Sequence, residues 1–137
     1  MHFNKLIPEL SVVDLGRSLA FYVGVLRFQV EFERPADRFA FVAYQGSQLM
    51  LEQDNEQWLT APAQYPRGRG VNFEIETDEL EALAQRLRQH EVPLFREPSM
   101  ARYATETTTE EVRELLVQDP DGYLLRFQQT QSQTLRA

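Results

Sequence analysis

The sequence predicts an α+β fold of two tandem βαβββ modules, which form a curved, mostly antiparallel sheet with the helices on its convex side. Three observations lead to this fold class. Apolar residues alternate along short segments in both halves of the 137-residue chain, as strands with one buried face require. Near the start of each half, one segment instead shows helical spacing of its apolar residues. The second half also repeats the pattern of the first.

In the first half, residues 5–13 alternate as a strand that places Leu10 and Val12 on one face. Asp14 follows as the expected N-cap of a helix over residues 15–26, where apolar residues recur every three or four positions. Three strands are then expected, over residues 28–33, 38–44 and 48–53.

In the second half, residues 71–76 alternate like the first strand. Asp78 and Glu81 predict a capping box at the start of a helix that carries Leu80, Leu83 and Leu87. Short strands are expected over residues 92–95, 111–118 and 123–128, the last two joined by a type I turn at 119–122. Residues 97–112 lack periodicity, so we expect a long mobile loop or an irregular sheet edge there.

Two offsets relate the halves: Leu10 falls on Ile75 at an offset of 65, and Leu49 falls on Leu125 at an offset of 76. The second half therefore carries 11 extra residues, which we place in the 97–112 segment. We expect one domain over residues 1–137. Within it, module one spans about 5–53, a linker about 54–70 and module two about 71–129.

The composition excludes several classes of function. The chain has no Cys and only two His, which excludes disulfides, iron–sulfur clusters and cysteine nucleophiles and leaves little for a His-rich metal site. Twenty-one acidic against 14 basic residues give a net charge of -7, which disfavours nucleic acid as a partner. The sequence shows neither a long apolar run nor a secretory signal, so we expect a cytoplasmic protein without membrane association.

The runs Ser11–Tyr22 and Val117–Phe127, set in paired βαβββ modules, resemble the vicinal oxygen chelate superfamily. The likeness is greatest to its glyoxalase/bleomycin resistance branch and covers about Lys5 to Gln129. This superfamily includes glyoxalase I, extradiol dioxygenases, epimerases, fosfomycin-modifying enzymes and drug-binding proteins. The fold alone therefore does not choose among these functions.

In the metal-using members, four side chains on the concave face bind a divalent ion, one from the first and one from the last strand of each module. Carried over to this sequence, the four positions are Ile7, Met50, Asn72 and Arg126. Ile7 has no donor atom, Met50 offers a soft thioether, and Arg126 brings a permanent positive charge. The resemblance therefore implies no metal, no cofactor and no catalytic residue. A register shifted by two residues would instead supply a carboxylate-rich quartet: Glu9, Glu52, Glu74 and Gln128.

Strand alternation gathers carboxylates and apolar groups on the concave face. Acids that converge there focus negative potential and favour a cationic ligand, and aromatic residues at the rim can stack on flat groups. The expected ligand-binding residues are Glu9, Met50, Glu52, Trp58, Asn72, Glu74, Tyr103 and Arg126. In a competing interpretation, each acid is a solvated strand residue or a partner of Arg126, and Phe39 and Phe41 are ordinary core residues.

We therefore expect a metal-independent small-molecule binding protein resembling bleomycin resistance proteins, which confer antibiotic resistance by sequestering the drug. The ligand would be cationic or planar, for example a basic glycopeptide antibiotic, held in a cleft at the interface of a homodimer. One alternative is an enzyme, a metal-dependent lyase, isomerase or dioxygenase of the superfamily. Another is a binder of an unrelated metabolite.

Overall fold

The computed structural model describes residues 1–135 of the chain. The first half contains β1 (Glu9–Val12), α1 (Leu15–Leu19), the π-helix η1 (Ala20–Val25), β2 (Gln29–Arg34), the 3₁₀ turn η2 (Pro35–Asp37), β3 (Phe39–Tyr44) and β4 (Ser47–Gln53). The second half contains β5 (Asn72–Glu76), α2 (Leu80–Gln89), β6 (Arg96–Ala104), β7 (Thr108–Gln118) and β8 (Leu124–Leu135). The predicted α+β class and the βαβββ repeat are confirmed.

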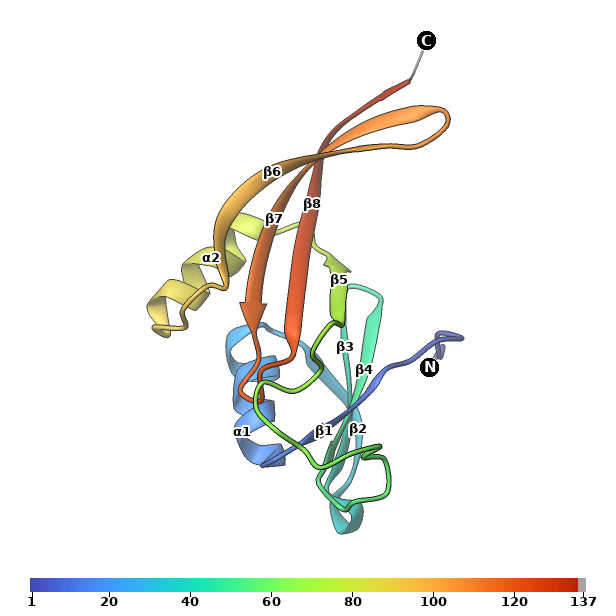
Figure 1. Cartoon of the computed structure of the whole chain (residues 1–137), viewed down its shortest axis with the longest axis vertical. Coiled ribbons are helices and arrows are strands. Elements are labelled where there is room, and N and C mark those ends of the chain that lie inside the picture. The colour runs from blue at the N-terminus through green and yellow to red at the C-terminus, as the bar shows by residue number, and fades with distance from the viewer. Residues whose placement is uncertain (136–137) are drawn as a thin grey trace. The chain divides into compact units, whose positions relative to one another are not determined.

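Each half builds a four-stranded mixed sheet (Figure 1), with strand orders β1-β4-β3-β2 and β5-β8-β7-β6. In each sheet the first strand of the module runs parallel to the last, and the other pairs are antiparallel. Glu9 lies opposite Met50 in the first sheet, and Glu74 lies opposite Arg126 in the second. The offsets of 65 and 76 therefore describe the actual strand register of both sheets.

The chain forms two compact units that do not follow the two halves completely. Unit one contains residues 1–69 together with Asp119–Tyr123, and unit two contains residues 70–118 and the chain from Leu124 onward. Within unit one, the Tyr22 hydroxyl donates a hydrogen bond to Asp119 over 2.8 Å, and Arg17 pairs with Asp121 over 2.7 Å. Among the described residues, no helix has the length and apolar character needed to cross a membrane.

In unit one, the helical segment begins where the sequence predicts. The Asp14 carboxylate accepts a hydrogen bond from the Arg17 amide over 3.1 Å, as an N-cap should. The segment continues as a π-helix and buries Tyr22 and Val25. Gln53 on β4 accepts a hydrogen bond from the Leu15 amide over 3.0 Å, so the helix covers the sheet face that carries Gln53.

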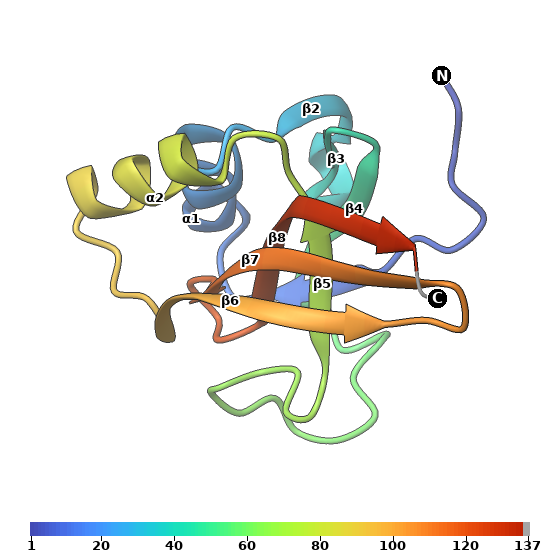
Figure 2. The same cartoon turned by 90° about the horizontal axis from the view of Figure 1, so that it is seen from above.

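In unit two, α2 forms as predicted, but it begins one residue later than the predicted capping box of Asp78 and Glu81 places it. The N-cap is Glu79, whose side chain makes no capping hydrogen bond. The first helical amide, that of Leu80, instead donates to the side chain of Gln129 on β8 over 3.1 Å. A long-range contact therefore satisfies the first amide of this helix. Figure 2 shows α2 on one side of the sheet of unit two, where it contacts β7 and β8.

Of the two interpretations of residues 97–112, the loop is wrong, whereas an irregular edge fits, since β6 is the last strand of its sheet and its register shifts between Arg96 and Ser99. Most of this segment is an antiparallel hairpin of β6 and β7, paired from Ser99 opposite Glu114 to Ala104 opposite Thr109. The short strand expected over residues 92–95 is absent, because β6 begins at Arg96. Most side chains of β6 are exposed on both faces, so the strand lacks the alternation that would predict it.

Candidate ligand-binding site

Unit one presents a sheet face that points away from its helix, and we call it the open face of unit one. Two rows of side chains cross this face. The first row is Phe32, Phe41, Met50 and Glu9, and the second is Arg34, Phe39, Glu52 and Ser11. The sequence-predicted residues Glu9, Met50 and Glu52 therefore lie together, beside aromatic rings.

The carboxylates of this face influence each other. Burial raises the pKa of Glu9, the nearby Glu52 charge raises this pKa further, and Arg34 opposes both effects. Glu52 is buried, and its carboxylate accepts a hydrogen bond from the side-chain amide of Asn55. Two acids held this close favour an added positive charge.

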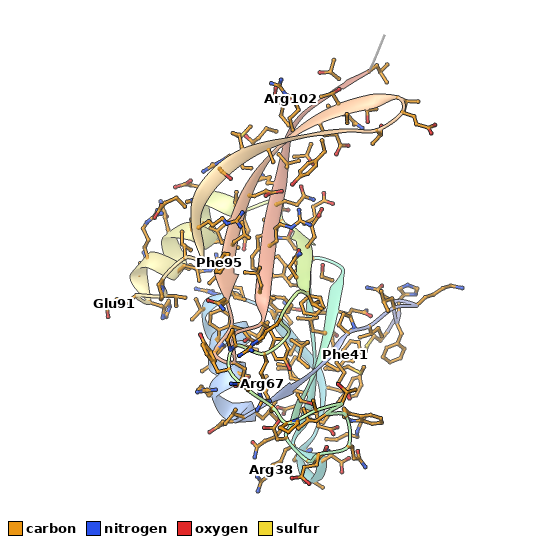
Figure 3. All side chains as sticks on the ribbon, in the orientation of Figure 1. Arg38, Phe41, Arg67, Glu91, Phe95 and Arg102 are labelled. Carbon is orange, nitrogen blue, oxygen red and sulfur yellow. The ribbon has the colours of Figure 1, made fainter. Side chains whose placement is uncertain are left out.

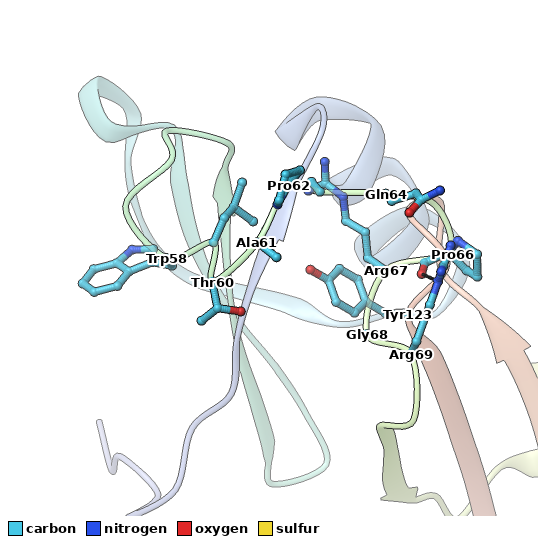
Figure 4. A pocket seen from close by; sticks show the side chains of 12 residues that line it. Trp58, Thr60, Ala61, Pro62, Gln64, Pro66, Arg67, Gly68, Arg69 and Tyr123 are labelled. Carbon is cyan, nitrogen blue, oxygen red and sulfur yellow. Dashed lines mark hydrogen bonds between the residues drawn. The ribbon is translucent and has the colours of Figure 1, made fainter.

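Trp58 lies in the loop between β4 and β5 with 61% of its side chain exposed. It borders two hollows of unit one. One, of about 580 Å³, is lined by Trp58 and Glu52 together with Arg34, Arg38, Asp37 and Asp54. The other, of about 500 Å³, is formed by the loop itself with Arg67 and Tyr123 (Figure 4). The structure thus brings Trp58 and Glu52 to the same hollow.

Arg67 fixes this loop to the rest of unit one. Its guanidinium makes two hydrogen bonds of 2.7 Å to Asp54 and one of 2.9 Å to the carbonyl of Ser11. The hydrogen bonds to Asp54 raise the pKa of Arg67, which stays charged. Sequence reasoning missed this role, because an arginine in a glycine-rich loop gives no indication of a partner 13 residues away.

Unit two gathers three predicted residues and Glu114 around Arg126, and we call this group the Arg126 cluster. The guanidinium of Arg126 lies 2.9 Å from Glu74, 3.3 Å from Glu114 and 3.1 Å from the side-chain oxygen of Asn72. The Tyr103 hydroxyl donates a hydrogen bond to Glu114 and lies 3.3 Å from Arg126. This hydrogen bond raises the pKa of Tyr103. The cluster is a closed network in which each charged group already has a partner.

Glu74 is thus a partner of Arg126. The competing interpretation of the sequence proposed this role for the acid. Glu114 was missed, because it lies within a strand whose buried residues indicated only core packing. Its position contains a signal, since Glu114 is a charged residue directly before the apolar run Leu115–Val117, which is buried. The predicted ligand roles of Asn72, Tyr103 and Arg126 remain predictions.

Phe39 and Phe41 are buried although they lie on the open face. Their burial agrees with the competing interpretation, in which both are ordinary core residues. The guanidinium carbon of Arg34 lies 3.9 Å from the ring centroid of Phe39, a cation–π contact. Phe41 stacks on Phe32 with the ring centroids 5.1 Å apart. Figure 3 shows Phe41 on the sheet of unit one beside the N-terminal segment.

Comparison with known proteins identifies one matching family. The profile of the Glyoxalase/Bleomycin resistance protein/Dioxygenase superfamily matches residues 2–127. A member of this superfamily from Vibrio splendidus 12B01 shares 32% sequence identity, over 88% of this chain and 94% of that one, with a TM-score of 0.41. None of the curated proteins compared matches the chain.

Other solved structures share the fold at lower identity. TioX from Micromonospora sp. ML1 has a TM-score of 0.70 at 18% identity, covering 93% of this chain and 98% of TioX. A virulence protein from Salmonella typhimurium has a TM-score of 0.68 at 20% identity, covering 94% of this chain and 98% of that one. At such identities the likeness concerns the fold alone.

Proposed function

This chain belongs to the Glyoxalase/Bleomycin resistance protein/Dioxygenase superfamily, and from that premise we propose that it binds a small cationic or planar molecule without a metal ion. As in the bleomycin resistance proteins, the ligand would be sequestered and released without chemical change. Members of one superfamily differ in function according to the residues of the site, so the argument rests on those residues.

The four positions that hold a metal ion in metal-using members do not fit one here. Ile7 has no donor atom, and Met50 offers a thioether between Phe41 and Glu9. Arg126 brings its own positive charge and engages Glu74 and Glu114 with it. A hard divalent ion would meet an apolar group, a soft sulfur and a cation at these positions.

The observation that carries the proposal is the hollow shared by Trp58 and Glu52. An exposed indole offers a face for a flat ring or a cation, and a nearby carboxylate offers the opposite charge. Asp37 and Asp54 in the same hollow are already paired, with Arg34 and Arg67 respectively. Glu52 is therefore the acid of this hollow that we assign to the ligand.

The proposal includes a homodimer. Trp58 is largely exposed in one chain, so a second copy that covers it would exclude water from the bound ligand and strengthen the attraction to Glu52. Sedimentation velocity with and without ligand tests this part, since a monomer that binds the ligand at full affinity would contradict it.

A thermal-shift experiment on metal-stripped protein tests the function. We expect bleomycin and the planar cation proflavine to raise the melting temperature, and Mn²⁺, Ni²⁺, Zn²⁺ and Fe²⁺ to leave it unchanged. Trp58→Ala and Glu52→Gln should each weaken proflavine binding, and Glu52→Gln should flatten its salt dependence. Glu56→Gln is the matched control, because this exposed neighbour makes the same charge change outside the hollow.

The alternative is a metal-dependent lyase, isomerase or dioxygenase that uses the shifted quartet. One observation favours it: the side-chain oxygen of Gln128 is buried without a hydrogen-bond partner in the described part of the chain. Against it, Glu74 of the same quartet is bound to Arg126. A melting temperature raised by a metal ion alone would favour the enzyme.

A further inference from the structure

The open face of unit one already holds an aromatic ring that comes from the N-terminal segment. The ring centroid of Phe3 lies 5.4 Å from that of Phe41 and 6.3 Å from that of Phe32. The ring of Phe3 stands nearly perpendicular to both, with interplanar angles of 86° and 83°. Aromatic pairs favour this edge-to-face arrangement, so the face has the geometry of a ring-binding site.

Few contacts hold the segment of residues 2–4 in place. The side chain of Gln48 accepts a hydrogen bond from the Asn4 amide over 2.8 Å and donates one to the His2 carbonyl over 2.7 Å. The Asn4 side chain donates to the Gly46 carbonyl over 2.9 Å. The segment belongs to no strand or helix, and Phe3 is 52% exposed. A segment with such contacts opens at low cost while the sheet stays folded.

Phe41, the ring beneath Phe3, is buried although it lies on the open face. Phe41 is only 1% exposed although it points away from the helix, and its ring contacts on this face are with Phe3 and Phe32. Departure of Phe3 would expose Phe41 beside Met50, its partner on β4. A flat ring in the place of Phe3 would meet an aromatic ring and a polarizable thioether, both of which favour aromatic ligands.

We infer that Phe3 is a built-in occupant of an aromatic binding site on the open face of unit one, and that a planar aromatic ligand binds there by displacing residues 2–4. The inference rests on the proposed small-molecule binding. It does not depend on the charge of the ligand or on Trp58. The ligand competes with the chain's own ring, so the measured affinity is the intrinsic affinity reduced by the fraction of chains in which the site is open.

The test is a fluorescence titration with N-phenyl-1-naphthylamine, a neutral aromatic probe. Phe3→Ala should lower the dissociation constant about tenfold, because it removes the competing ring. Gln48→Ala should act in the same direction, since it releases both backbone contacts of residues 2 and 4. Leu6→Ala is the matched control: Leu6 lies two residues after this segment and is 84% exposed, and this variant should match the wild type.

Amide hydrogen exchange gives a second readout. The Asn4 amide is bonded to Gln48, so saturating probe should speed its exchange in the wild type. An unchanged or weakened affinity in Phe3→Ala, no binding to that variant, or unchanged Asn4 exchange would each overturn the inference. Because the probe carries no charge, these results leave the effects of Glu52→Gln and Trp58→Ala on proflavine as a separate test of the proposed function.

Discussion

Replacing Asp119 by Asn should remove a pH-dependent contribution to the free energy of unfolding. Asp119 is 3% exposed and accepts hydrogen bonds from the Tyr22 hydroxyl and from the amides of Asp121 and Tyr123. Burial raises its pKa from 3.8 to about 6, and the hydrogen bonds only partly offset this rise. An Asn side chain keeps the two amide hydrogen bonds at its carbonyl oxygen, presents an NH2 group to the Tyr22 hydroxyl, and does not ionise in this range.

The sign and size of the effect follow from proton linkage. Between pH 3.8 and about 6 the folded protein keeps a proton on Asp119 that the unfolded chain has released. The free energy of unfolding therefore falls as the pH rises through this range. At about 1.36 kcal/mol per pKa unit, the total loss is roughly 3 kcal/mol.

Urea unfolding followed by circular dichroism between pH 4 and 7.5 measures this effect. The wild type should lose stability relative to Asp119→Asn by up to about 3 kcal/mol as the pH rises, with no further change above about pH 7. Parallel pH profiles of the two proteins would refute the reasoning.

A tyrosine pair provides the control for this measurement. Tyr22→Phe removes a hydrogen bond that lowers the pKa of Asp119, so it should move the midpoint of the pH profile upward. Tyr123→Phe removes a hydrogen bond of the same length to the neutral carbonyl of Ser11, and it should leave the midpoint in place. Equal midpoints in the two variants would contradict the assigned role of Tyr22.

Two further substitutions test contacts of each unit. Gly122→Ala should lower the free energy of unfolding by at least about 2 kcal/mol, because φ of Gly122 is +96° and an added Cβ would lie 2.6 Å from Pro66. A stability equal to that of the wild type in urea unfolding would contradict this close approach. Arg126→Met should lower the free energy of unfolding by about 1–3 kcal/mol in the same assay, since Glu74 and the buried Glu114 lose their cation. Arg126→Lys should keep only part of the wild-type stability, because lysine lacks the planar guanidinium fork. Full wild-type stability in Arg126→Lys would contradict the proposed geometry.

The parts of the fold that alternation predicts are those with one buried face. Leu10 and Ile75 lie on strands whose apolar residues meet a helix, so their period of two is visible in the sequence. β6 has no such face, since nearly all its residues from Arg96 to Ala104 are exposed, and its pairing with β7 comes from backbone hydrogen bonds that no side-chain pattern records. The extra residues of the second half form this hairpin instead of a loop.

The candidate site divides in the same way. Strand alternation predicts that Glu9, Met50 and Glu52 share a face, because residues two positions apart on a strand point to the same side of the sheet. The register places Glu74 opposite Arg126, but it cannot show that Glu114 also holds this arginine, because long side chains reach across strands in directions that spacing does not fix. The clamp of Arg67 on Asp54 was missed because Arg67 lies in a loop, where no strand pattern indicates a partner.

The turn Asp119–Tyr123 makes unit one discontinuous along the chain, and this governs the order in which the protein can fold. The hydrogen bonds of this turn join residues far apart in the sequence. The separation is 97 residues for Tyr22 and Asp119, 104 for Arg17 and Asp121, and 112 for Ser11 and Tyr123. Closing such long loops costs entropy, so the turn joins unit one late, after synthesis has passed residue 123. A cut at the linker would therefore leave the first half without the turn that completes unit one.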